Sequence, residues 1–129
     1  MIYVDSSIAL AHLLVEDRRP SPALWTEPLI ASRLLEYEVW CRLHAHALAA
    51  SHGAGARELL GRVSMVELSP LVLARALEPF PVPLRTLDAL HLASIEFLRS
   101  CRLQPRLASY DERMLRAATA MGIDLLEPS

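Results

Sequence analysis

The sequence of 129 residues contains no lysine, so the 13 lysine-or-arginine positions are all arginine. Its two cysteines, Cys41 and Cys101, form no CxxC pair, which favours a reduced, intracellular compartment over a disulfide framework. No apolar run approaches the roughly 18 residues that a membrane-spanning helix needs. The first residues lack the basic region of a signal peptide, so we expect a cytoplasmic protein without membrane contact.

The composition predicts one globular domain over residues 1–129. Hydrophobic residues make up 53% of the chain and charged residues 22%, which excludes a disordered protein. The apolar share also leaves surface for a protein partner or a dimer contact. The net charge of −2 argues against broad electrostatic capture of nucleic acid, although arginine can bind a phosphate through two hydrogen bonds.

Strand-like and helical segments alternate along the chain, which predicts an α/β fold with a mostly parallel central sheet flanked by helices. We expect strands over residues 2–4, 28–31, 65–68, 106–109 and 123–126. We expect helices over 8–14 (capped by Ser6 or Ser7), from Pro22, over 33–52 (capped by Ser32 and ended by Gly53), and over 56–63, 70–77, 87–99 (capped by Thr86) and 111–121. The proline-rich segment 78–83 is expected to be extended.

Two acidic residues directly follow predicted strands. Asp5 ends the first strand, and Asp111 follows the strand at 106–109. Either residue could simply begin a helix. Ser109 and Glu112, however, already have the spacing of a capping box, so Asp111 is not needed as the cap. Ligands of open α/β sheets bind outside the carboxyl ends of the strands, where both acids are expected to lie.

Two further acids are expected on helices. Asp88 lies in the first turn of the most apolar helix, where a buried carboxylate needs a donor, a cation or a metal, and His91 one turn later could pair with it. Glu38 and Glu36 both lie on apolar faces of the helix after the second strand, so periodicity does not choose between them. A group of carboxylates at one sheet edge requires a counter-charge, for which Mg²⁺ or Mn²⁺ is suited. Such sites typically perform phosphoryl chemistry on a water nucleophile.

Four motifs together resemble those of PIN-domain ribonucleases, and within them the VapC toxins of bacterial toxin–antitoxin pairs. The motifs are Tyr-Val-Asp-Ser-Ser at 3–7, Ser-Arg-Leu-Leu-Glu-Tyr-Glu-Val at 32–39, Leu-Arg-Thr-Leu-Asp-Ala-Leu-His-Leu-Ala at 84–93 and Ser-Tyr-Asp-Glu-Arg-Met at 109–114. The resemblance covers nearly the whole chain and implies a PIN-like three-layer α/β/α fold. It selects Glu38, six residues after Ser32, over Glu36. It further implies that Asp5, Glu38, Asp88 and Asp111 hold the metal and perform catalysis, with Ser6 and Ser109 beside it.

By this resemblance, the protein would be a Mg²⁺- or Mn²⁺-dependent endoribonuclease that acts as a toxin. Its substrate would be single-stranded or loop RNA, such as a tRNA or an rRNA, and its products would carry a 5′-phosphate and a 3′-hydroxyl. The resemblance also implies a cognate antitoxin and a homodimer. Four arginines near the predicted site edge are candidates to attract phosphate, namely Arg18, Arg19, Arg85 and Arg113.

Other functions fit the sequence less well, with one exception. A haloacid-dehalogenase-like phosphatase needs Asp-x-Asp after the first strand, and a phospho-receiver domain needs a late lysine; the chain has neither. A zinc site from His44, His46 and His52 is disfavoured because His44 and His46 point to different helix faces. A catalytically silent PIN-like domain that binds a partner stays open, and divalent-metal binding that is lost on replacing Asp5 or Asp88 would distinguish the two.

Overall fold

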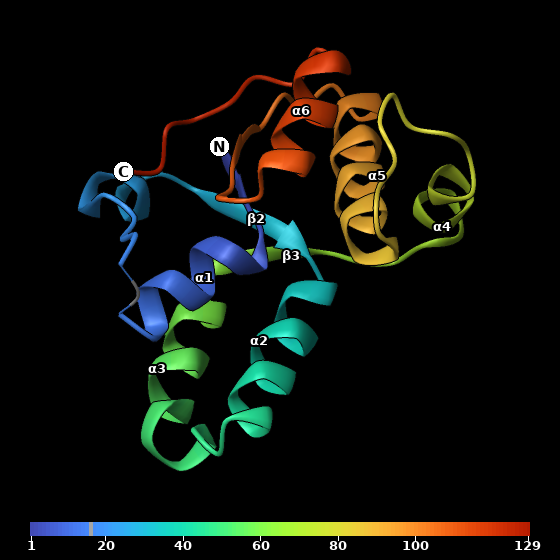
Figure 1. Cartoon of the computed structure of the whole chain (residues 1–129). Helices are drawn as coiled ribbons and strands as arrows, with labels where there is room; N and C mark the ends of the chain where they lie inside the picture. Colours follow the sequence, from blue (N-terminus) through green and yellow to red (C-terminus); the bar gives the residue numbers. More distant parts are fainter. Residues whose placement is uncertain (16) are drawn as a thin grey trace.

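The computed structural model describes residues 1–15 and 17–129. Within them, four strands form a parallel sheet in the order β3-β2-β1-β4 (Figure 1). The strands are β1 (Ile2–Val4), β2 (Leu29–Ser32), β3 (Val63–Val66) and β4 (Arg106–Ala108). Tyr3 in β1 lies beside Ile30 in β2 and Leu107 in β4, so the first strand is central and its carboxyl end meets those of its neighbours.

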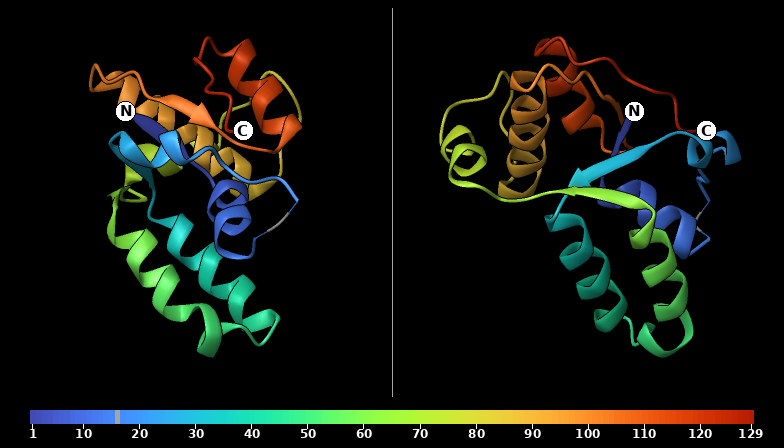
Figure 2. Two further views of the ribbon diagram at one scale, coloured as in Figure 1. Left: turned by 90° about the vertical axis from the view of Figure 1, so that its left-hand side faces the viewer. Right: turned by 180° about the vertical axis from the view of Figure 1, so that it is seen from behind.

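The helices connect these strands and cover the sheet. They are α1 (Ser6–Leu13), the 3₁₀ helix η1 (Pro22–Thr26), α2 (Leu34–Ala45), α3 (Ala49–Gly61), α4 (Pro70–Ala76), α5 (Thr86–Ser100) and α6 (Glu112–Ala120). Figure 2 shows α2 and α3 as an antiparallel pair extending from one side of the sheet. Helix α4 packs on the outside of α5.

Alternation along the strands divides the core into two layers. Ile2 and Val4 face one side, where they join a buried cluster with residues of α1, α2 and α3, such as Ile8 and Leu35. Tyr3 points to the other side and packs with residues of α5 and α6, such as Leu92. Helices therefore cover both faces of the sheet, which confirms the predicted three-layer α/β/α arrangement. None of the described helices is long and apolar enough to cross a membrane.

The prediction of one long helix over residues 33–52 is wrong. The chain forms α2 and α3 instead, separated by residues 46–48. Ala47 takes a left-handed backbone conformation, with φ of 54°, and this reverses the chain so that α3 packs against α2. Gly53 lies inside α3 and is buried, with a Trp40 ring carbon 3.2 Å from where a Cβ atom would be. The helix expected at 56–63 is the continuation of α3, which ends at Gly61.

Several helix caps and one strand also differ from expectation. Asp5 rather than Ser6 or Ser7 caps α1, and Asp111 rather than Ser109 caps α6. Thr86 is already inside α5, whose cap position is Arg85. The expected strand at 123–126 is only an isolated bridge between Leu107 and Leu125. The third strand begins two residues earlier than expected, at Val63.

Candidate active site

Asp5 is the most deeply buried acid of the candidate site. Its position directly after β1 makes it the N-cap of α1, where Oδ1 accepts hydrogen bonds from the Ser7 hydroxyl at 2.6 Å and from the Ile8 amide at 3.3 Å. The Ser109 hydroxyl donates to its other oxygen, Oδ2. Burial raises the pKa of Asp5, and these donors together with His91 act against that rise. The helix-cap role and the site role therefore fall on the same carboxylate.

Ser109 links Asp5 to Asp111. Ser109 follows β4, and its hydroxyl oxygen accepts the Asp111 amide at 2.9 Å while donating to Asp5. Oδ1 of Asp111 accepts the amides of Arg113 and Met114 at 3.0 and 3.1 Å, which fixes the start of α6. The adjacent carboxyl ends of β1 and β4 thus bring the carboxylate of Asp5 and the backbone amide of Asp111, more than 100 positions apart in sequence, to one hydroxyl group.

Asp88 lies in the first turn of α5, partly buried. Burial raises its pKa, and the carboxylates of Asp111 and then Asp5 raise it further, while His91 and Arg85 act in the opposite direction. These charges place Asp88 in the same electrostatic environment as Asp5 and Asp111. The rise in pKa shows that the positive groups nearby do not balance the three acids together with the cost of burial.

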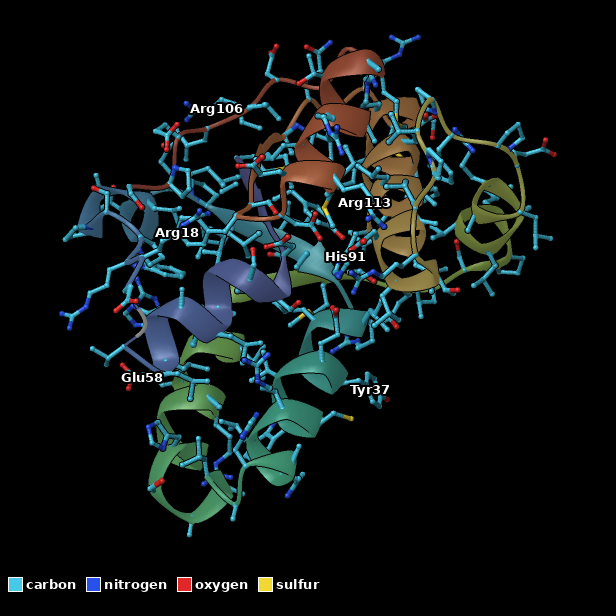
Figure 3. All side chains as sticks on the ribbon, in the orientation of Figure 1. Arg18, Tyr37, Glu58, His91, Arg106 and Arg113 are labelled. Carbon is cyan, nitrogen blue, oxygen red and sulfur yellow. The ribbon has the colours of Figure 1, made fainter. Side chains whose placement is uncertain are left out.

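Glu38 reaches the site from α2, and Glu36 does not. The Ser6 hydroxyl donates to Oε2 of Glu38 at 3.1 Å, and Nε2 of His91 lies 2.6 Å from Oε1. Glu36 is instead paired with Arg33 at 3.6 Å near the helix surface. Figure 3 shows Tyr37, the residue between them, pointing outward from α2, while His91 lies toward the interior. The structure therefore brings Glu38 beside Ser6, next to Asp5 in sequence.

A buried tyrosine–histidine pair completes the site and was missed by sequence reasoning. The hydroxyl of Tyr3 lies 2.7 Å from Nδ1 of His91 and accepts the amide of Ser32 at 3.0 Å. His91 is 1% exposed and Tyr3 is fully buried. The pairing with Asp88 that the sequence allowed for His91 is not formed, because the ring bridges Tyr3 and Glu38. Tyr3 gave no functional signal, since an aromatic residue is ordinary in a buried strand.

The donor set matches a hard divalent cation in its chemistry. Four carboxylates supply oxygen ligands, and the charges of Asp111 and Asp5 add to burial in raising the pKa of Asp88. Within residues 1–15 and 17–129, however, no three acidic, histidine or cysteine side chains converge closely enough to hold an ion. The side chains would therefore have to turn toward one another to coordinate a metal.

The four candidate arginines differ in their relation to the acids. The charge of Arg85 acts directly on Asp88, and Arg113 follows Asp111 by two residues on α6. Arg18 lies on the α1 side (Figure 3), with its guanidinium 5.5 Å from the centre of the Tyr110 ring, and it lines a pocket together with Ser7. Arg19 is exposed, and its carbonyl accepts the hydroxyl of Ser129. Arg85 is therefore the candidate whose charge acts on one of the four carboxylates.

Comparison with known proteins identifies the family. The PIN-domain family model matches residues 2–120. Across 99% of its length the chain is 34% identical to Ribonuclease VapC46 of Mycobacterium tuberculosis, covering 98% of that protein, and 28% identical to Ribonuclease VapC35, covering 97%. The fold is similar to the crystal structure of M. tuberculosis VapC20, described as a sarcin-ricin loop cleaving toxin, with a TM-score of 0.72. The two sequences are 20% identical, and the match covers 99% of this chain and all of the VapC20 chain. The protein belongs to the PIN-domain family, within its VapC group of ribonucleases.

Proposed function

We propose that the protein is a metal-dependent endoribonuclease that acts as the toxin of a toxin–antitoxin pair. The observation that carries this proposal is that Asp5, Asp88 and Asp111 lie at the carboxyl edge of the sheet, where burial and then the charges of Asp111 and Asp5 raise the pKa of Asp88. Membership of the VapC group supports the choice of RNA, because the curated relatives are named as ribonucleases. PIN-domain ribonucleases of this group generally depend on divalent metal ions, and we propose Mg²⁺, with Mn²⁺ as a substitute.

Asp5, Glu38, Asp88 and Asp111 would hold the ion, directly or through water. A bound divalent ion activates water and neutralises charge at the phosphate. The protein supports this arrangement with hydroxyl groups: Ser109 fixes Asp5 relative to Asp111, and Ser6 fixes Glu38. The carboxylates of Asp88, Asp111 and Asp5 repel one another, and a bound cation would offset that repulsion, so the site is suited to bind a metal and a phosphate together.

The RNA substrate would be drawn to the site locally, because the chain carries a net charge of −2. Arg85 and Arg113, beside Asp88 and Asp111, are the arginines proposed to contact phosphate there. Single-stranded or loop RNA is proposed because such segments expose individual phosphates and bases, whereas a duplex shields its bases.

The first test is cleavage of a mixed pool of tRNA and structured RNA by the purified protein, with Mg²⁺, with Mn²⁺ and with EDTA. We expect metal-dependent cutting that is lost in EDTA and in Asp5→Asn. Asp124→Asn, which changes an exposed acid away from the four carboxylates, is the matched control and should retain activity. Absence of both cleavage and Mn²⁺ binding in the folded wild-type protein would refute the nuclease proposal and favour a silent PIN-like interaction module.

The proposed partners are a cognate antitoxin and a second copy of the chain. An exposed apolar surface supports a protein partner: Leu71 and Leu77 of the α4 region are 71% and 88% exposed, and Leu77 lines a groove of about 810 Å³. Light scattering of the isolated protein should give twice the monomer mass of 14.3 kDa if it dimerises. A single monomer mass at every concentration would contradict the homodimer but not the nuclease.

A further inference from the structure

We propose that Tyr3 and His91 are positioning residues, which hold the Glu38 carboxylate in a fixed place beside Ser6. The inference rests on the proposed function, because it assigns Glu38 a part in metal binding. Three hydrogen bonds form a continuous chain: the Ser32 amide to the Tyr3 hydroxyl at 3.0 Å, Tyr3 to His91 Nδ1 at 2.7 Å, and His91 Nε2 to Glu38 Oε1 at 2.6 Å. This chain connects β2, β1, α5 and α2.

The donors and acceptors of the chain can be assigned from one end to the other. The Ser32 amide must donate, so it occupies a lone pair on the Tyr3 oxygen. At the other end of the chain, the Glu38 carboxylate can only accept, so Nε2 of His91 carries a proton and donates it to Oε1. Nδ1 of His91 can then accept the hydrogen of the Tyr3 hydroxyl, which leaves every group in the chain with a partner.

The side chain of Glu38 depends on such hydrogen bonds for a fixed conformation more than the three aspartates do. Asp5 and Asp111 are fixed by helix-cap hydrogen bonds to the backbone, and Asp88 has a short side chain on the first turn of α5. A glutamate has an additional rotatable bond, and fixing its rotamers costs entropy. His91 on Oε1 and Ser6 on Oε2 restrict both oxygens of Glu38.

Burial separates this role from catalysis. His91 is 1% exposed and Tyr3 is 0% exposed, so neither side chain reaches solvent or a substrate. Any effect of His91 on the reaction must therefore pass through neighbouring groups, and Glu38 is the acid to which it is hydrogen-bonded. Partners of this kind typically change metal affinity or activity by about 10–100-fold when they are removed.

The test is a double-mutant cycle on Mn²⁺ affinity, measured by electron paramagnetic resonance without RNA. We expect His91→Leu to weaken Mn²⁺ binding by about 10–100-fold. His91→Gln, whose amide N–H can take the place of Nε2–H, should restore much of that loss, and Tyr3→Phe should give a smaller loss. In a Glu38→Gln background, His91→Leu should cause no further loss, because the two residues would act as one unit.

A second measurement on the wild-type protein covers the case in which His91→Leu does not fold. Long-range ¹⁵N–¹H spectra should show the Nε2–H tautomer for one histidine, whose signals are absent in His91→Gln. The Nδ1–H tautomer, or equal Mn²⁺ affinity in folded His91→Leu and wild type, would overturn the positioning role and leave the nuclease proposal intact. A wild-type protein that neither binds Mn²⁺ nor cuts RNA would overturn both.

Discussion

Replacing Asp88 by Asn should stabilise the metal-free protein and abolish its response to metal. The Asp88 carboxylate is partly buried and lies in the field of Asp111 and Asp5, which Arg85 and His91 offset only in part. Removing one such like-charge interaction near the protein surface is worth about 1 kcal/mol. For a domain of 129 residues, this corresponds to a rise of about 4 °C in the melting temperature.

The pH dependence of this gain follows from the direction of the pKa shift. Because the folded-state pKa of Asp88 is raised above its ordinary value of 3.8, the folded protein binds the proton more tightly than the unfolded chain does. The free energy of unfolding of the wild type therefore decreases as the pH rises from about 3.8 through the raised pKa. The advantage of Asp88→Asn should be full above that window and vanish below it.

Thermal melting in EDTA and in Mn²⁺ provides the assay. Mn²⁺ at 100 times its dissociation constant stabilises a binding protein by about 2.7 kcal/mol, so wild type should melt above Asp88→Asn in Mn²⁺ and below it in EDTA. Asp124→Asn removes the same charge from an exposed position and should show no such crossover. A lower melting temperature for Asp88→Asn in EDTA would refute the reasoning, since it would mean that the carboxylate stabilises the start of α5 more than its neighbours repel it.

Three further predictions concern single residues. Glu38→Gln should reduce RNA cleavage by more than about 100-fold in a single-turnover assay. Glu36→Gln, which alters only the ion pair with Arg33, should leave the cleavage rate nearly unchanged. Equal losses in the two variants would contradict the choice of Glu38. Ala47→Gly should raise the free energy of unfolding by about 1 kcal/mol in a urea titration, because φ is 54° there, and a loss of stability would contradict this. Leu35→Ala, at a fully buried position, should cost about 2–5 kcal/mol by the same titration. Leu77→Ala, at a side chain that is 88% exposed, should change stability by less than about 0.5 kcal/mol, and similar costs for both would contradict the assigned core.

Local sequence patterns determined the fold class and most elements. The apolar run at residues 2–4 predicted β1, and alternation of strands and helices predicted the parallel sheet with helices on both faces, because these patterns report burial over a few residues. The turn at Ala47 could not be predicted in the same way. Nothing in that sequence breaks a helix, and the positive φ is held by packing of α3 on α2.

The same division applies to the candidate site. The four motifs selected Asp5, Glu38, Asp88 and Asp111, and their roles stay predictions. The sequence could not show that Ser109 joins Asp5 to the backbone of Asp111, or that His91 contacts Glu38 and Tyr3 instead of Asp88. Residues 3, 38 and 91 meet only when β1, α2 and α5 come together around the sheet. Sequence thus determined which side chains carry charge, and tertiary structure decided which partners hold them, because hydrogen bonds between distant segments depend on packing that no local pattern records.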